Sequence, residues 1–123
     1  MDYEITISKH HSHVVIKFYA AMTTSLACRC GPELVRIAAE HNINRFLFDV
    51  TQSKNIQSVT DNYYFAYKDI EDFDFPRASR SAFLVRPGDK SHDFITTAFL
   101  NAGYLVKLFT DEATALAWLD DRE

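Results

Sequence analysis

Leu105-Val-Lys-Leu-Phe109 leads directly into Thr110-Asp-Glu-Ala-Thr-Ala-Leu-Ala-Trp-Leu119, a short apolar strand followed at once by an amphipathic helix. We expect Thr110 to cap this helix, because a threonine hydroxyl can accept a hydrogen bond from the free backbone N–H groups of a first turn. Asp111 and Glu112 would then lie where the helix dipole favours negative charge. The same succession of strand and helix recurs through the chain, and it predicts a fold rather than a reaction.

Four more strands are expected upstream of this unit. Arg45-Phe-Leu-Phe-Asp-Val50 and Ser81-Ala-Phe-Leu-Val-Arg86 are apolar without alternation, which is typical of strands covered on both faces. Apolar and polar residues alternate in two N-terminal stretches, 3–7 and 14–18, which a short polar loop joins. This pattern predicts an antiparallel pair at the N-terminus.

Helices are expected between the later strands. The first covers Met22 to Asn42 and either starts or bends at Pro32, because proline suits a first helical position better than an interior one. Another runs from about Ser91 and ends at Gly103, which we expect to be its C′ residue.

The helix between these two starts at Ser58, whose hydroxyl is expected to cap it, and runs to Phe73. Tyr63, Tyr67 and Ile70 fall on one face of a regular helix and fit the core. The neighbouring aromatic residues must then point elsewhere.

The element order is β-β-α-β-α-β-α-β-α, in one domain over residues 1–123 without a linker or repeat. Strands separated by helices need crossover connections, which give parallel pairing with helices covering the sheet. The sequence therefore predicts an α/β fold with a mixed, mostly parallel five-stranded sheet and about four covering helices.

Composition and charge exclude several classes of protein. Hydrophobic residues make up 47% of the chain, which fits a packed globular protein and excludes intrinsic disorder. The net charge is -4 and lysine and arginine do not cluster, so nucleic acid is not an expected partner. No apolar run approaches the length of a membrane span and the first residues lack a signal-peptide pattern, so we expect a cytoplasmic protein.

Metals, disulfides and cofactors are not expected. Cys28 and Cys30 are two residues apart, and on a helix their side chains diverge, which suits neither a disulfide nor a shared metal. His10, His11 and His13 form the densest group of metal-ligating residue types, but a solvated hairpin loop explains them and no further ligand is identifiable.

Phe48-Asp-Val-Thr51 and the closing Leu-Phe-Thr-Asp-Glu-Ala-Thr-Ala-Leu-Ala-Trp-Leu make the chain resemble the SpoIIAA-like family of the STAS superfamily over nearly its whole length. The resemblance implies a mixed sheet with helices and a bacterial regulator that docks onto other proteins. The best-known branch resembles anti-sigma-factor antagonists, which are switched by phosphorylation of a serine in a D-S-S-G type motif. The related CRAL-TRIO fold carries lipids.

At the place of that motif this chain has Asn55-Ile-Gln-Ser-Val-Thr60, so Ser58 is the one candidate phosphorylation site. It lacks the preceding acid and the following glycine, and helix capping alone explains a serine here. A phosphate at this position would be stabilised by the free N–H groups of the helix N-terminus.

Candidate ligand-binding residues follow two of the central strands. Asp49 and Thr51 end the first, and Arg86, Lys90 and Ser91 follow the next. Ligands of open α/β sheets bind outside the carboxyl ends of the strands, and helix N-termini beside two cations suit an anion such as a phosphate or carboxylate. The alternative is that these polar residues cap helices and form ion pairs, and that nothing binds.

Tyr63 and Tyr67 are further candidate ligand-binding residues, because the helix that starts at Ser58 is unusually aromatic. Its rings can line a pocket for an apolar ligand, form a homodimer contact or pack in the interior. A pocket enclosed by these two tyrosines and Phe94 would favour a carrier, whereas an exposed patch with Tyr64 and Phe65 would favour a protein interface.

No residue set indicates a reaction. The G-x-S-x-G elbow is absent, and no Ser-His-Asp arrangement follows from spacing. We therefore expect a non-catalytic regulatory or docking domain that binds a protein partner or itself. The alternative is a binding or carrier protein for a small apolar or anionic ligand.

Overall fold

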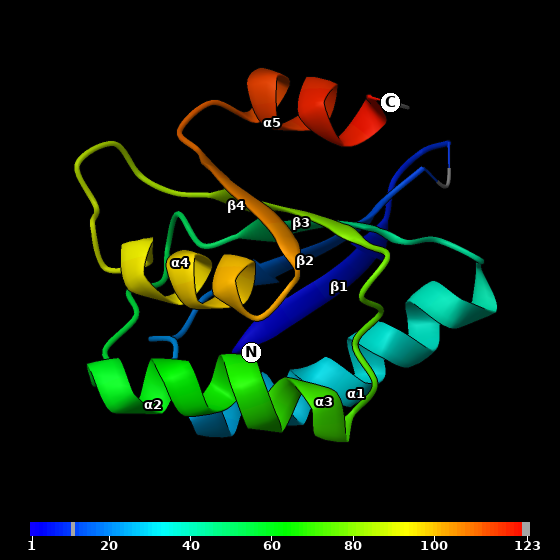
Figure 1. Cartoon of the computed structure of the whole chain (residues 1–123). Coiled ribbons are helices and arrows are strands. Elements are labelled where there is room, and N and C mark those ends of the chain that lie inside the picture. The colour runs from blue at the N-terminus through cyan, green and yellow to red at the C-terminus, as the bar shows by residue number, and fades with distance from the viewer. Residues whose placement is uncertain (11, 122–123) are drawn as a thin grey trace.

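The computed structural model describes residues 1–10 and 12–121, and a five-stranded sheet runs through its centre (Figure 1). The strands lie side by side in chain order: β1 (Tyr3–Ile7), β2 (Val14–Phe18), β3 (Arg45–Asp49), β4 (Arg80–Leu84) and β5 (Leu105–Phe109). β1 pairs antiparallel with β2, and every later pair is parallel. The predicted α/β class, the mixed sheet and the N-terminal antiparallel pair are confirmed.

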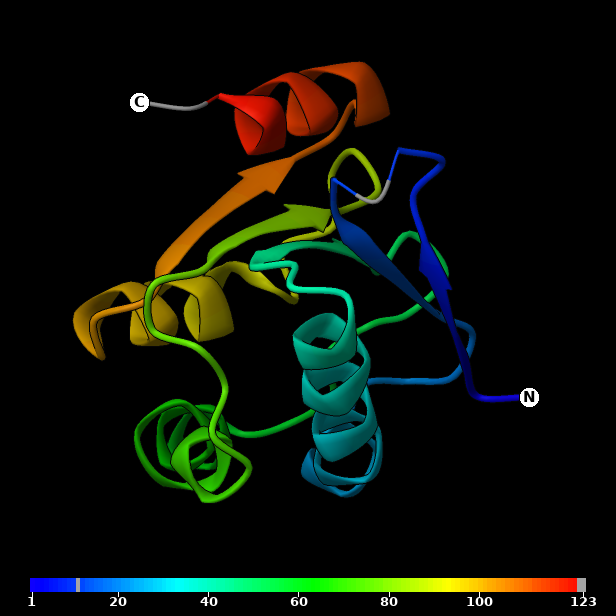
Figure 2. The ribbon, with the colours of Figure 1, turned by 90° about the vertical axis from the view of Figure 1, so that its right-hand side faces the viewer.

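The helices divide unequally between the two faces of the sheet (Figure 2). One face is covered by α1 (Thr24–Glu40), by a continuous segment of α2 (Val59–Tyr64), η1 (Phe65–Asp69) and α3 (Ile70–Asp72), and by α4 (Asp93–Asn101). Strand order follows chain order, so right-handed crossovers place every connecting helix on that face. α5 (Glu112–Asp120) follows the last strand and lies alone on the other face.

Alternation along the strands builds a separate core on each face. Val14, Ile16 and Phe18 of β2 are buried on the face of the connecting helices, which we call the helix-rich face. The opposite face, here called the α5 face, has a smaller core of Leu47, Ala82, Leu84, Ala115 and Leu119.

α1 passes through Pro32 instead of starting there. Thr23 caps the helix, because its hydroxyl accepts the N–H of Leu26 at 3.1 Å. An interior proline removes one backbone hydrogen bond and costs about 3 kcal/mol. The burial of Leu26, Cys30 and Leu34 along one stripe offsets that cost, so a start of the helix at Pro32 is ruled out.

A π-helical turn interrupts the second helix, which the sequence analysis did not predict. The N–H of Ile70 bonds the carbonyl of Phe65, five residues back, so the turn holds one residue more than an α-turn. Phe65 and Ile70 are therefore 8% and 4% exposed, whereas Tyr63 and Tyr67 are 39% and 45% exposed. The expectation that Tyr63, Tyr67 and Ile70 share a core face is wrong.

The end of α4 and the start of α5 were both predicted from single residues in the sequence. Gly103 has a φ of +99° and donates its N–H to Leu100, as expected of the C′ residue of α4. At α5, however, Asp111 is the cap, and its Oδ2 accepts the N–H of Thr114 at 2.9 Å. A carboxylate combines the cap hydrogen bond with a favourable charge at the positive end of the dipole. The predicted cap at Thr110 is therefore wrong by one residue.

Candidate functional site

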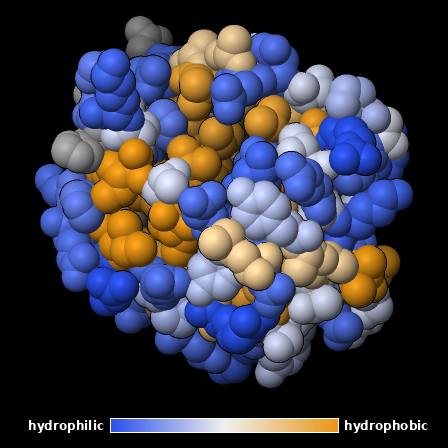
Figure 3. All heavy atoms as spheres, turned by 180° about the vertical axis from the view of Figure 1, so that it is seen from behind, coloured by the Kyte–Doolittle hydropathy of each residue, from blue (hydrophilic) through white to orange (hydrophobic). Residues whose placement is uncertain are grey.

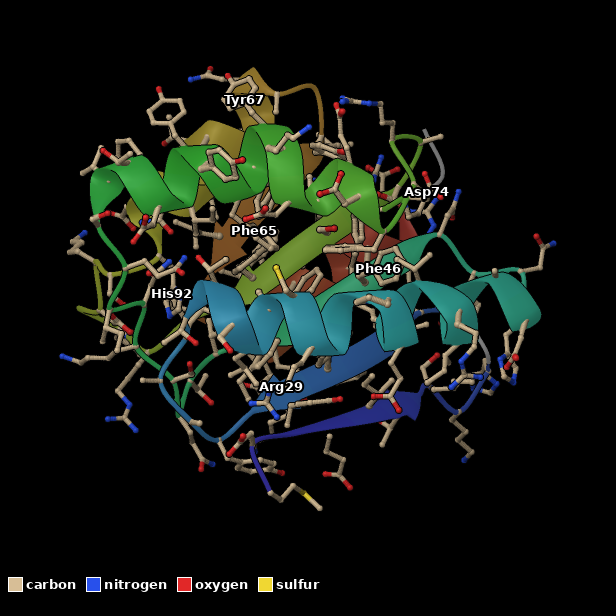
Figure 4. The ribbon with its side chains drawn as sticks, turned by 90° about the horizontal axis from the view of Figure 1, so that it is seen from below. Arg29, Phe46, Phe65, Tyr67, Asp74 and His92 are labelled. Carbon is tan, nitrogen blue, oxygen red and sulfur yellow. The ribbon has the colours of Figure 1, made fainter. Side chains whose placement is uncertain are left out.

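An interior cavity of about 80 Å³ lies between the helix-rich face of the sheet and its covering helices. Phe83 of β4, Phe65 of η1 and Phe99 of α4 contribute to its wall, which is mostly aromatic and aliphatic. Figure 4 shows Phe65 on the inner side of η1, facing the space beside α1. Such a wall suits an apolar molecule, because a charged group inside would lose its hydration without gaining a partner.

One end of the cavity is polar and is formed by Asn55, Gln57 and His92. Asn55 Nδ2 donates to Asn62 Oδ1 at 2.9 Å, and Gln57 Nε2 donates to the same oxygen at 3.3 Å. The hydroxyl of Thr24 donates to Gln57. These bonds join the start of α1, the loop after β3 and α2 into one network.

His92 is 1% exposed and is fixed by a backbone carbonyl. Its Nε2 donates to the carbonyl of Ser53 at 2.8 Å and lies 3.8 Å from Asp89 Oδ2. Within the described part of the chain, His92 Nδ1 and Ser53 Oγ have no hydrogen-bond partner. A catalytic triad needs the serine hydroxyl on a ring nitrogen. Ser53, His92 and Asp89 therefore lie together without forming one.

Cys30 also lines the cavity, and its thiol is inert. Burial raises the pKa of Cys30 to about 12, and its sulfur lies 3.6 Å from the carbonyl of Ala27. Cys28 is exposed, and partial burial followed by the charges of Asp69 and Asp72 raises its pKa as well. Both cysteines are free thiols, and neither is a reactive thiolate at neutral pH.

An open hollow of about 620 Å³ lies at the carboxyl ends of β3 and β4. It brings together two of the predicted ligand residues, Thr51 and Arg86, and adds Lys54 as a second cation. Asp89 lies in the same wall, and although burial acts to raise its pKa, hydrogen bonds from Ser91 outweigh burial and lower it. The charge of Asp89 therefore opposes an anion in this hollow.

Asp49, Lys90 and Ser91 lie outside the wall of this hollow. Asp49 Oδ1 accepts the N–H of Thr51 at 3.1 Å and its hydroxyl at 2.7 Å. Ser91 Oγ accepts the N–H of Asn55 at 3.1 Å, and Lys90 is exposed. The polar atoms of Asp49 and Ser91 thus hydrogen-bond to residues of the loop after β3. Ligand binding by these two residues stays a prediction.

An aromatic face, defined by Tyr63, Tyr64, Tyr67 and Phe94, lies on the surface of α2, η1 and α4. Tyr63 stacks on Tyr67 with ring centres 5.6 Å apart and meets the edge of Phe94 at 5.0 Å. Tyr64 is 58% exposed, and Tyr67 lies on the side of its helix away from α1 (Figure 4). The predicted residues Tyr63 and Tyr67 are therefore brought together, but outside the cavity, whereas Phe65 lines it.

Ser58 caps α2, as predicted. Its Oγ accepts the N–H of Asp61 at 3.1 Å, and the residue is exposed. The hydroxyl is thus both accessible and engaged, and phosphorylation of Ser58 stays a prediction.

The β1 edge of the sheet is a further candidate surface. β1 is the outermost strand on the side seen from behind, and hydrophobic surface gathers there among polar side chains (Figure 3). Ile5 and Ile7 of β1 are only half-buried. A half-buried apolar edge strand can pair with another chain, so this edge is a second place for the predicted self-association.

The described residues contain neither a metal-ligand cluster nor a membrane-spanning helix. Among residues 1–10 and 12–121, His, Cys, Asp and Glu form no group of three that could hold a metal ion. His11, part of the histidine cluster in the sequence, lies outside the described residues. Every helix in the described part of the chain is too short or too polar to span a bilayer.

No family model matches this chain, and no curated protein matches it in sequence. Its structure is similar to that of an uncharacterized protein of the DUF3478 family from Shewanella loihica PV-4, described as having a SpoIIAA-like fold. The TM-score is 0.60 at 21% sequence identity, over 95% of this chain and 93% of the other. The fold is SpoIIAA-like. The fold resemblance inferred from the sequence is confirmed, and at this identity the similarity concerns the fold alone.

Sequence reasoning missed the interior cavity of this SpoIIAA-like fold and the polar group around His92. Ser53 and His92 are 39 positions apart in the sequence. Thr24 and Asn55, which lie on different elements, both hydrogen-bond to Gln57 in the network beside them. One signal was present in the sequence: His92 follows a predicted strand, at the edge of the sheet where polar residues of neighbouring loops meet. The π-turn has no comparable sequence signal.

Proposed function

We propose that this SpoIIAA-like chain is a non-catalytic docking module that binds a protein partner, or a second copy of itself, through the aromatic face. The observation that carries the proposal is the exposure of three tyrosines, Tyr63, Tyr64 and Tyr67, on one continuous helical segment. Tyrosine is enriched at protein interfaces because its ring supplies contact area at little cost in conformational entropy. Isolated exposed rings are common on surfaces, but adjacent ones indicate a contact site.

Photo-crosslinking tests this proposal. p-Benzoylphenylalanine replaces Tyr64 in one variant and, as a matched control, the exposed Tyr19 at the end of β2 in another. We expect a discrete crosslinked complex from position 64, as a dimer or with a protein of the source cell, and its loss when Tyr67→Ser is added. Equal crosslinking from both positions, or none from position 64, would contradict the proposal.

Ser58 gives this module a candidate regulatory site, because it lies at the start of the helix that carries the aromatic face. A phosphate there would add charge beside the docking surface and would still find free N–H groups. Ser58→Asp is therefore expected to change partner crosslinking from position 64 while the fold stays intact. If Ser58→Ala lowers the melting temperature, Ser58→Asp keeps it and crosslinking is unchanged in both, Ser58 is a cap without a switch.

The interior cavity favours a second candidate function, the binding of a small apolar molecule. Its wall includes Phe65, Phe83 and Phe99, and its volume of about 80 Å³ exceeds the space that one water molecule needs. A native mass spectrum of the purified protein, repeated after denaturation, tests this role. Extra mass that is lost on denaturation would support it, and a bare polypeptide mass that is unchanged after incubation with benzene would count against it.

A further inference from the structure

Negative charge is concentrated on the segment that carries the aromatic face. Residues 58–74 contain one lysine and five carboxylates, those of Asp61, Asp69, Glu71, Asp72 and Asp74. The net charge of this segment equals the formal charge of -4 of the whole chain, so the positive and negative charges of the remaining residues cancel. A molecule that approaches the aromatic face therefore meets a negative potential.

Among the residues that the structure describes, four of these five carboxylates form no ion pair, Asp74 included. The fifth, Glu71, bonds Arg77 at 2.6 Å. Asp61 and Asp72 are exposed and Asp69 is half-buried. Asp69 and Asp72 lie on the side toward Cys28 of α1, so a partner on the aromatic face reaches them at its α1 side.

The protein itself shows which group fits between a tyrosine ring and a carboxylate. The guanidinium of Arg77 lies 4.7 Å from the ring centre of Tyr104 while it bonds Glu71. A guanidinium stacks flat on a ring and keeps its N–H donors for carboxylate oxygens. Tyr64 and Asp61 are three residues apart on α2, so they offer the same two groups without the arginine.

We infer that the partner's contact segment is a basic, arginine-bearing stretch of protein that packs on the aromatic face and pairs with Asp61, Asp69 and Asp72. This inference rests on the proposed docking function and specifies the chemistry of the partner. An arginine of the partner repeats on Tyr64 the arrangement that Arg77 makes on Tyr104.

The same charges argue against other occupants. An anionic membrane surface or a nucleic acid would be repelled by the carboxylates of this segment. A wholly apolar partner would strip water from three carboxylates without pairing them, which is unfavourable. A second copy would bring the same acidic segment against this one in a symmetric contact.

A peptide titration tests the inference. The probe is a fluorescein-labelled peptide of arginine and leucine, and its counterpart has glutamate at every arginine position. Fluorescence anisotropy is expected to show binding of the arginine peptide alone, weakening as salt increases. The triple variant Asp61→Asn, Asp69→Asn, Asp72→Asn is expected to bind about tenfold more weakly, since three exposed ion pairs are lost.

A control variant separates local pairing from net charge. Glu40→Gln, Glu112→Gln, Asp120→Asn removes the same charge from exposed positions at the end of α1 and on α5. We expect this control to bind within about twofold of the wild type. If it binds as weakly as the aspartate variant, attraction is governed by net charge and the inference is overturned.

The remaining outcomes distinguish the docking function from the basic character of the partner. If the arginine peptide does not bind while the crosslinked complex from position 64 persists, the partner is not basic and the docking function stands alone. If neither is observed, both fail. Sedimentation of the protein with phosphatidylglycerol vesicles would identify a membrane as the occupant and would also overturn the inference.

Discussion

The two faces of the same sheet are packed in different ways. On the α5 face, Ala82 and Ala115 are fully buried and let α5 lie close to β4, with Leu119 beside them at 0% exposed. On the helix-rich face, large rings such as Phe83 and Phe99 meet at centre distances near 6 Å and leave the interior cavity. A close-packed face contributes stability, whereas a face with space can accept another molecule.

Two arginines of the sheet also hold the C-terminal end of α5 on its face. Arg80 donates to the carbonyl of Trp118 at 2.6 Å and stacks over its ring at 4.9 Å, and Arg45 donates to the carbonyl of Leu119. These carbonyls belong to the last turn of the helix, where the regular donors four residues ahead are missing and the Trp118 carbonyl receives the N–H of Asp121 at 3.3 Å. α5 is therefore held by side chains from two strands, as well as by its apolar residues.

Removing a side chain from the α5 face is expected to have the largest effect. Leu119→Ala should lower the free energy of unfolding by about 3 kcal/mol, because the side chain is fully buried and its neighbours cannot collapse into the space. Urea denaturation measures the loss. Leu105→Ala, at a position 47% exposed, is the control and should cost less than about 0.5 kcal/mol. Equal losses in the two variants would mean that α5 is not part of the cooperative core.

Enlarging a side chain should have different effects on stability at the two faces. Ala115→Leu has no room beneath α5 and should cost about 2 kcal/mol. Ala27→Leu introduces the same atoms beside the interior cavity and should change stability by less than about 1 kcal/mol. Paired thermal melts compare them. A larger loss for Ala27→Leu would show that the cavity cannot accept added volume, and would weaken the apolar-ligand candidate too.

Gly31→Ala probes a close contact between α1 and Phe73 on the helix-rich face. A Cβ at Gly31 would lie 2.6 Å from Cζ of Phe73, so α1 or the ring of Phe73 must move. Because alanine also favours the helix, we expect a net loss of about 1 kcal/mol. Phe73→Leu in the Gly31→Ala background should recover part of that loss in the same denaturation assay. No recovery would mean that the strain lies elsewhere in α1.

The smallest effect concerns pH. Burial lowers the pKa of His13, although Asp120 and Glu112 of α5 act in the opposite direction. The folded state thus favours the neutral ring, while the unfolded chain takes up a proton near pH 6.5. Stability is fully present above that pH and is lost as pH falls from there through the lowered pKa. His13→Gln should flatten the stability profile below about pH 6.5. An unchanged slope would mean that other groups cause the pH dependence.

Elements with local signals could be predicted from the sequence. β5 has its expected bounds, because a short apolar run follows the stop at Gly103. Ser58 caps α2 because its hydroxyl needs only the N–H of Asp61, three residues away. The start of α1 was not predictable in the same way, since the cost of Pro32 is outweighed by burial against distant residues.

The candidate site was predicted in outline only. The sequence placed Thr51 and Arg86 at one edge of the sheet, and the structure brings them into one hollow. It could not place His92 against Ser53, nor open a cavity beneath Phe65, because both depend on how separate elements pack. Tyr63 and Tyr67 were expected to share a core face because a regular helix was assumed, and the π-turn changes which side of the segment faces the sheet.

That π-turn has a consequence for the length of the chain. Residues 65–69 occupy a turn that contains one residue more than an α-helix needs. Deleting one residue there would restore a regular helix and rotate everything before it by about 100° relative to α3. A homologue with a one-residue gap at this place would therefore turn its equivalents of Tyr63 and Tyr64 to a different side, and an alignment of relatives would show the change of surface as a single gap.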